Sequence, residues 1–214
     1  MSLDMRTLGV LILAMSVFVL AMTEIAKRFY AAKLAALYER GEMGEYLHTL
    51  EMPLVRLVFP AWNRAFMRMN ALMVEEDRSA LDKLIPEMLC MGQSPKQRRE
   101  LIGRAFNYYV EQGNEVGAKP LLEEIERVEP SEVSKQARMT YEIYLEKSFA
   151  YIDAMETRLS EVSGVNRGFT ELLLAIQYEN KGDARRAEQY FEKSCREIEG
   201  AVACPSPEEA LSGE

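Results

Sequence analysis

The side chains able to do chemistry are few in this sequence, and they are scattered. His48 is the single histidine among 214 residues, and no Glu-x-x-His pattern accompanies it as a zinc hydrolase would require. No glycine-rich phosphate loop and no Gly-x-Ser-x-Gly turn for a nucleophilic serine is found. The carboxylates of Glu123-Glu124 and of residues 75–77 have the pattern of solvated faces or turns. We therefore expect a protein that is not an enzyme and that has no cofactor, no metal and no small-molecule substrate.

Charge and cysteine content narrow the class of protein further. The chain has 26 Lys and Arg against 34 Asp and Glu, for a formal net charge of −8. Nucleic-acid binding depends on clustered Lys and Arg, so we expect no nucleic-acid partner. Cys90, Cys195 and Cys204 form neither a metal-binding spacing nor an even disulfide set. Cys90 and Cys195 fall on apolar helix faces, and we expect both to be buried thiols.

The elements that must position any binding residues are amphipathic helices. In the segment 99–130, apolar residues recur at intervals of three and four on both sides of Gly113-Asn114. That pair breaks the helix, and Pro130 ends the second half. A hairpin of two such short helices cannot bury its own apolar face, so it requires similar neighbours.

This segment resembles a tetratricopeptide repeat, a helical hairpin of about 34 residues. The positions of the family pattern are occupied here by Ile102, Ala105-Phe106, Tyr109, Ala118, Leu122 and Pro130. Phe106 replaces the family's Gly. A second match over 168–199 comprises Leu174-Ala175, Tyr178, Gly182-Asp183, Ala187 and Phe191. The resemblance implies close helix packing at Ala118 and Ala187.

Regular spacing of the turns extends the pattern to the rest of the chain. The expected turns between helices are Gly41, Glu76, Gly113, Ser148 and Gly182, at intervals of 35, 37, 35 and 34 residues. We expect an all-α protein built as a right-handed helical-hairpin repeat stack of about five degenerate repeats over residues 24–199. An irregular helical bundle is the alternative.

The segment 7–23 contains no charged residue over its 17 positions. A transmembrane helix needs about 17 to 25 apolar residues, and flanking side chains such as Arg6, Lys27 and Arg28 can extend to the interface. We expect a transmembrane helix at 7–23 after a short flank at 1–6. A cleaved signal peptide and a buried core helix are the alternatives.

Basic residues predict the orientation of this segment. Arg6 precedes it, whereas Lys27, Arg28, Lys33 and Arg40 follow it. The positive-inside rule then predicts a single-pass protein of the cell membrane with its repeats in the cytoplasm. Residues 200–214 are acidic and contain two prolines, so we expect a disordered tail there.

The resemblance also implies a binding groove, because the first helices of tetratricopeptide repeats line a concave face. The groove candidates are Tyr38, Asn63, Phe66, Asn70, Met73, Asn107, Lys135 and Arg138, with Glu142 opposing the two cations. The amides of Asn70 and Asn107 can bind the backbone of an extended peptide. Arg138 can hold a carboxylate through two hydrogen bonds. Ordinary solvated side chains are the alternative interpretation of the whole set.

Together these features predict a membrane-anchored scaffold that binds a protein or a peptide, with one contact to the membrane through its N-terminal helix. Two other functions remain open from the sequence. One is an extracytoplasmic repeat module that assists the folding or assembly of envelope proteins. The other is a fixed structural subunit of a membrane complex.

Overall fold

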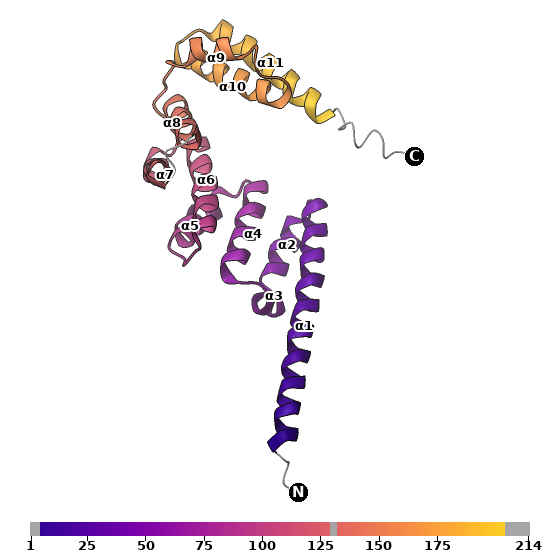
Figure 1. The fold of residues 1–214 in the computed structure, drawn as a ribbon. Coiled ribbons are helices and arrows are strands. Elements are labelled where there is room, and N and C mark those ends of the chain that lie inside the picture. Colours follow the sequence, from indigo (N-terminus) through magenta and orange to yellow (C-terminus); the bar gives the residue numbers. More distant parts are fainter. Residues whose placement is uncertain (1–4, 129–131, 204–214) are drawn as a thin grey trace. The chain divides into compact units, whose positions relative to one another are not determined.

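A computed structural model describes residues 5–128 and 132–203, and every regular element within them is an α-helix. The helices in chain order are α1 (Met5–Glu39), α2 (Met43–Leu50), α3 (Pro53–Val58), α4 (Ala61–Val74), α5 (Arg78–Leu89), α6 (Pro95–Glu111), α7 (Glu115–Val128), α8 (Glu132–Tyr144), α9 (Ile152–Arg158), α10 (Gly164–Asn180) and α11 (Ala184–Ala203). The chain divides into two compact units at residue 101, and each is described by itself (Figure 1).

A residue in the left-handed backbone conformation marks the turn inside each helical hairpin. These residues are Gly41, Glu76, Gly113, Lys147 and Gly182, with φ between 54° and 83°. Four of the five turns lie at the predicted residue. The fourth turn lies at Lys147, one residue before the predicted Ser148. The all-α class and the hairpin organisation are confirmed, and the right-handed sense of the stack stays a prediction.

Four of these turns are closed by the same pair of backbone hydrogen bonds. At Gly113, the Gly113 N–H donates to the Val110 carbonyl at 3.0 Å and the Asn114 N–H donates to the Tyr109 carbonyl at 2.8 Å. The same two bonds occur at Gly41, Glu76 and Gly182. This is the Schellman motif, in which a left-handed residue lets the chain satisfy the last carbonyls of a helix.

The residue after the turn then begins the second helix of the hairpin. Asp77, Asn114 and Asp183 each accept a hydrogen bond from the backbone N–H three residues further on, at 2.9 to 3.1 Å. A side-chain oxygen at this position satisfies one of the N–H groups that the first helical turn leaves unpaired. One short sequence pattern therefore ends one helix and starts the next.

One cluster of buried apolar side chains joins the first four helices. Its members are Leu34, Leu37, Met43, Tyr46, Leu50, Val55, Phe59 and Ala71. They come from the C-terminal part of α1, from α2, from α3 with the residue after it, and from α4. The sequence breaks the helix at Pro53: α2 ends at Leu50 and α3 begins at Pro53, where a missing backbone N–H costs nothing.

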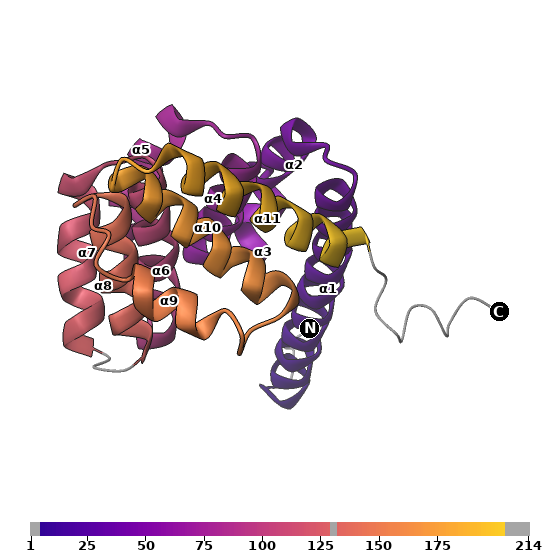
Figure 2. The ribbon, with the colours of Figure 1, turned by 90° about the horizontal axis from the view of Figure 1, so that it is seen from above.

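The second unit has a cluster where α8, α9 and α10 meet, formed by Ile143, Ile152, Met155, Leu174 and Tyr178. Figures 1 and 2 both show α11 running alongside α10. Gly168 permits this close contact, because a Cβ there would lie 2.7 Å from Ile198. Ala118 of α7 is fully buried, as the close packing predicted for it requires.

The predicted transmembrane helix at 7–23 requires correction. No helix breaker follows Thr23, and α1 accordingly continues to Glu39 and carries Glu24, Lys27 and Arg28. No helix in the described part of the chain is both long and apolar enough to cross a membrane.

Other expectations are corrected at single positions. Cys90 is exposed rather than buried, because it is the C-cap residue just after α5. Cys195 is half-buried on α11. That helix ends at Ala203, past the predicted boundary at 199. Pro130, most of the flank at 1–6 and the part of the predicted tail from 204 to 214 lie outside the described residues.

Two glycines of α6 and its turn should respond in opposite ways to the same substitution. Gly113→Ala places a Cβ on a left-handed residue and should destabilise the protein by about 1 to 2 kcal/mol. Gly103→Ala lies inside α6 with open space around its Cβ and should stabilise it by about 0.5 to 1 kcal/mol. Thermal unfolding followed by circular dichroism measures both effects. Equal midpoints for the two variants would contradict the turn geometry.

Candidate protein-binding surface

Four of the predicted groove residues form one row on α4. Asn63, Phe66, Asn70 and Met73 are separated by three, four and three residues, so they share one face of the helix. Asn63 is exposed, and the other three side chains are half-buried. The opposite side of α4 contributes Ala65, Met69, Ala71 and Leu72 to the interior. The structure thus brings together the predicted residues of this one helix.

Aromatic stacking fixes the apolar member of the row. The rings of Trp62 and Phe66 are stacked, with centroids 4.8 Å apart and an interplanar angle of 17°. Such a pair restricts the ring of Phe66 and presents a flat apolar surface beside the amides. Tyr38, the predicted groove residue of α1, is partly exposed and makes an edge-to-face contact with Tyr46 at 5.8 Å.

Three predicted residues belong to the second unit, and the structure gives two of them partners within the chain. Asn107 is exposed on α6. Lys135 forms an ion pair with Glu132 at 2.6 Å. Arg138 donates to both carboxylate oxygens of Glu126 from α7, in one case at 2.6 Å.

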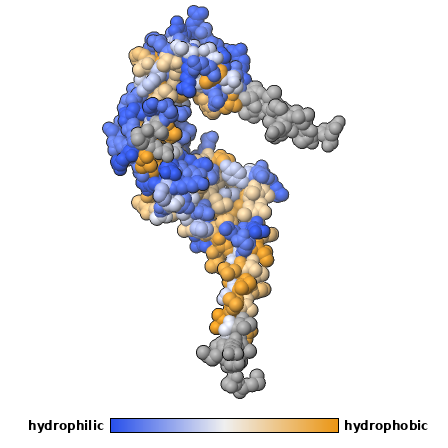
Figure 3. Space-filling model, in the orientation of Figure 1, coloured by the Kyte–Doolittle hydropathy of each residue, from blue (hydrophilic) through white to orange (hydrophobic). Residues whose placement is uncertain are grey.

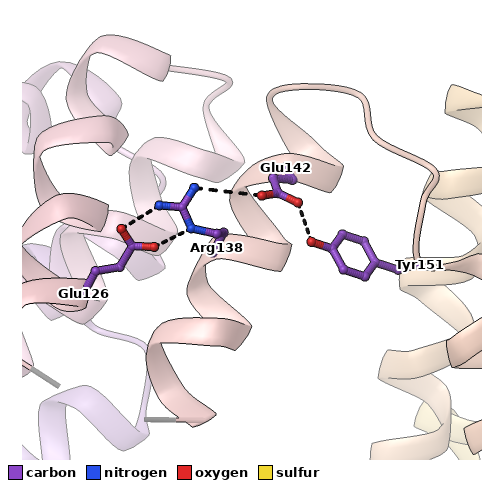
Figure 4. A network of polar contacts seen from close by, with 4 residues as sticks. All are labelled: Glu126, Arg138, Glu142 and Tyr151. Carbon is purple, nitrogen blue, oxygen red and sulfur yellow. Dashed lines mark hydrogen bonds and ion pairs between the residues drawn. The ribbon is translucent and has the colours of Figure 1, made fainter. Parts of the chain in front are cut away.

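The pairing of Arg138 is part of a longer network, which Figure 4 shows. The other side of the guanidinium lies 3.9 Å from Glu142, as predicted for this opposing carboxylate. Glu142 in turn accepts a hydrogen bond from the hydroxyl of Tyr151. The network Glu126–Arg138–Glu142–Tyr151 therefore connects α7, α8 and the residue before α9. Arg138 has a structural role here that its predicted role as a carboxylate receptor did not include.

The negative charge in this network acts on the tyrosine. The hydrogen bond to Glu142, together with burial, raises the pKa of Tyr151 to about 12. Loss of the phenolic proton would place two negative charges side by side, so the neutral hydroxyl is favoured. Glu126 likewise raises the pKa of Arg138 above its ordinary value through its hydrogen bond.

A second polar cluster joins α9 to the last hairpin, and sequence reasoning missed it. Glu156 accepts hydrogen bonds from the hydroxyls of Tyr178 at 2.6 Å and Tyr190 at 2.8 Å. The two tyrosine rings are stacked, with centroids 5.5 Å apart. Arg186 donates to the Tyr178 hydroxyl at 2.9 Å. Burial and, to a smaller extent, the hydrogen bond to Glu156 raise the pKa of Tyr190 to about 12.

An ion triad fixes α3 in the first unit. Glu51, which follows α2, accepts a hydrogen bond from Arg56 of α3 and another from Arg68 of α4 at 3.0 Å. The hydrogen bond from Arg56 lowers the pKa of the Glu51 carboxyl. All three side chains are partly solvated, so each pair contributes modestly to stability, but the shared carboxylate orients the short helix.

Comparisons with known proteins add little to this geometry. No family model matches the chain, and no curated protein matches it. A solved structure described as "MamA MSR-1 C2" has 20% identical residues and a TM-score of 0.48, over 83% of this chain and 99% of that chain. That degree of likeness carries no argument about function. The helices themselves define the class, an all-α protein of successive helical hairpins.

The tyrosine–carboxylate pairs predict a loss of stability at alkaline pH. An unfolded tyrosine loses its proton near pH 10, whereas Tyr151 and Tyr190 do so near pH 12 when folded. Their contribution is complete below pH 10 and is lost as the pH rises towards 12, because the unfolded state ionises first. Thermal unfolding midpoints measured from pH 8 to 12 should fall less in the double variant Tyr151→Phe/Tyr190→Phe than in the unmodified protein. The same decline in both proteins would contradict the two pairings.

Proposed function

We propose that this protein is a helical-repeat scaffold that binds a protein or peptide partner, not an enzyme. The row Asn63, Phe66, Asn70 and Met73 on α4 carries this proposal. It combines amide groups, which both donate and accept hydrogen bonds, with a stacked aromatic ring and a flexible thioether side chain. These are the groups that recognise an extended backbone while tolerating different side chains.

The repeat spacing identifies a counterpart of Asn70 in the second unit. Asn107 follows Asn70 by the same interval that separates the turns at Glu76 and Gly113, and it is exposed. Asn107 therefore occupies the equivalent position on α6. We do not assign carboxylate recognition to Arg138, because Glu126 already accepts two hydrogen bonds from its guanidinium.

The test is the affinity of a peptide selected from a random display library on the full-length protein. Asn70→Ala/Asn107→Ala should weaken binding by about 1 to 3 kcal/mol, because the peptide's backbone groups lose their partners at the interface. Gln189→Ala removes an exposed amide from α11 and should leave the affinity unchanged. Unchanged affinity in the double variant would exclude the row on α4 as the binding site.

We also propose that α1 attaches the scaffold to the cytoplasmic side of a membrane by inserting its apolar half into the bilayer. Large apolar side chains that are at least half exposed lie on all sides of this helix: Leu11, Ile12, Leu13, Met15, Val17, Phe18, Val19, Leu20, Met22, Ile25 and Phe29. Figure 3 shows the resulting hydrophobic surface. A helix that packs on a protein has one apolar stripe, whereas a lipid environment favours apolar residues all round.

The polar side chains in the apolar half of α1 are also compatible with a lipid environment. The hydroxyls of Ser16 and Thr23 donate to the carbonyls of Ile12 and Leu20, each at 2.8 Å. These hydroxyls therefore need no water, which matters in a hydrocarbon medium. Basic residues, beginning with Lys27 and Arg28, follow the apolar run, and such residues favour the cytoplasmic side.

Vesicle flotation tests the attachment. Full-length protein should float with phosphatidylcholine vesicles, and Val17→Arg should reduce the bound fraction strongly, because a cation at the centre of an apolar run costs about 2.5 to 3.5 kcal/mol. Val116→Arg is the matched control, since Val116 is an 87% exposed valine on α7. Failure of the unmodified protein to float would overturn the proposed attachment, and equal loss in both variants would show that it does not depend on α1.

A further inference from the structure

We infer that α3 is a second lipid contact, which inserts Leu54 and Leu57 into the interface of the same membrane surface. This inference rests on the attachment proposed for α1. Leu54 is 53% exposed and Leu57 is 75% exposed, although both belong to a helix that packs on the core of the first unit. Their separation by three residues places them on one face of α3.

The other sides of α3 are occupied by protein. Val55 is fully buried in the cluster of the first unit. Arg56 is held by Glu51, which also binds Arg68 of α4. The short helix therefore has a buried side, a side that forms ion pairs and a free apolar side. Its exposed leucines are not the result of a loosely held segment.

The position of α3 along α1 connects its free side with the apolar half of that helix. In Figure 1, α2 lies beside the C-terminal part of α1, and α3 lies further towards the N-terminus of α1. On α1, Ile25 and Phe29 are exposed beside two basic residues, Lys27 and Arg28, the second of which pairs with Glu24. Apolar, aromatic and basic side chains together are typical of the level where a bilayer meets water.

Lipid is the occupant that this arrangement favours. The helix that carries the exposed leucines packs on α1, whose exposed apolar residues lie on all sides of it, and one planar apolar medium can cover both surfaces at once. A second contact would also orient the first hairpin relative to the membrane, which α1 alone leaves free to rotate.

Fluorescent labelling at single cysteines tests the inference on the full-length protein, with the three native cysteines replaced by serine. An environment-sensitive dye is attached at Leu57→Cys, Val17→Cys or Val116→Cys, and phosphatidylcholine vesicles with brominated acyl chains are added. We expect a blue shift and quenching at positions 17 and 57 and neither effect at position 116.

The three probes separate the two ideas. Quenching at position 17 without quenching at position 57 overturns the role of α3 and leaves the attachment through α1 intact. No quenching at either position overturns both. Quenching at position 116 as well overturns the inference, because the contact would then not be specific to α3.

A pair of matched variants measures the contribution of the contact. Leu54→Asn/Leu57→Asn should weaken partitioning onto phosphatidylcholine vesicles about tenfold, the effect of losing part of the apolar area of two leucines. Val116→Asn/Val133→Asn alters two exposed valines of the second unit and should have no effect. Equal partitioning of all three proteins would overturn the inference.

Discussion

The hydrogen bonds that close four of the five hairpin turns are the constraint on which the rest of this structure depends. The last carbonyls of a helix need donors, and at a residue with positive φ its own N–H and that of the following residue supply them. Because a left-handed residue recurs every 34 to 37 residues, equivalent positions of successive hairpins recur at the same interval along the chain. The side chains available to a partner, such as Asn70 and Asn107, are selected by this interval rather than by local chemistry.

Most of the fold could be predicted because the hairpin turns require particular residue types, which can be recognised in the sequence. Gly41, Gly113 and Gly182 satisfy the left-handed position at no steric cost, and an acidic residue or Asn follows each of them. Glu76 has no such mark, and only the regular interval located it. At the fourth turn the regular interval predicted Ser148, whereas the left-handed residue is Lys147. The Ser148 N–H there donates to the Glu142 carbonyl, which lies one residue further back than the carbonyl acceptor in the other turns.

The polar contacts between helices were beyond the reach of sequence reasoning. Spacing along α8 identifies Arg138 as exposed, but it does not show that Glu126 of the preceding helix lies within hydrogen-bonding distance. The same holds for Glu156, whose two tyrosine partners come from α10 and α11. Such pairs depend on how the helices cross, and crossing is set by packing. The sequence does show that the apolar run of α1 continues into the core of the first unit, because no Gly or Pro lies between Thr7 and Arg40 except Gly9.

Because α1 is a single helix, its apolar half is connected rigidly to its C-terminal part. Leu34 and Leu37 are buried in the core of the first unit, and the apolar half belongs to the same unbroken helix. Each residue added or removed between the two parts would rotate one against the other by about 100° and shift it by about 1.5 Å. The number of residues between the two parts therefore sets the angle by which one is rotated relative to the other about the helix axis. Evolution can change the sequence of this segment more freely than its length.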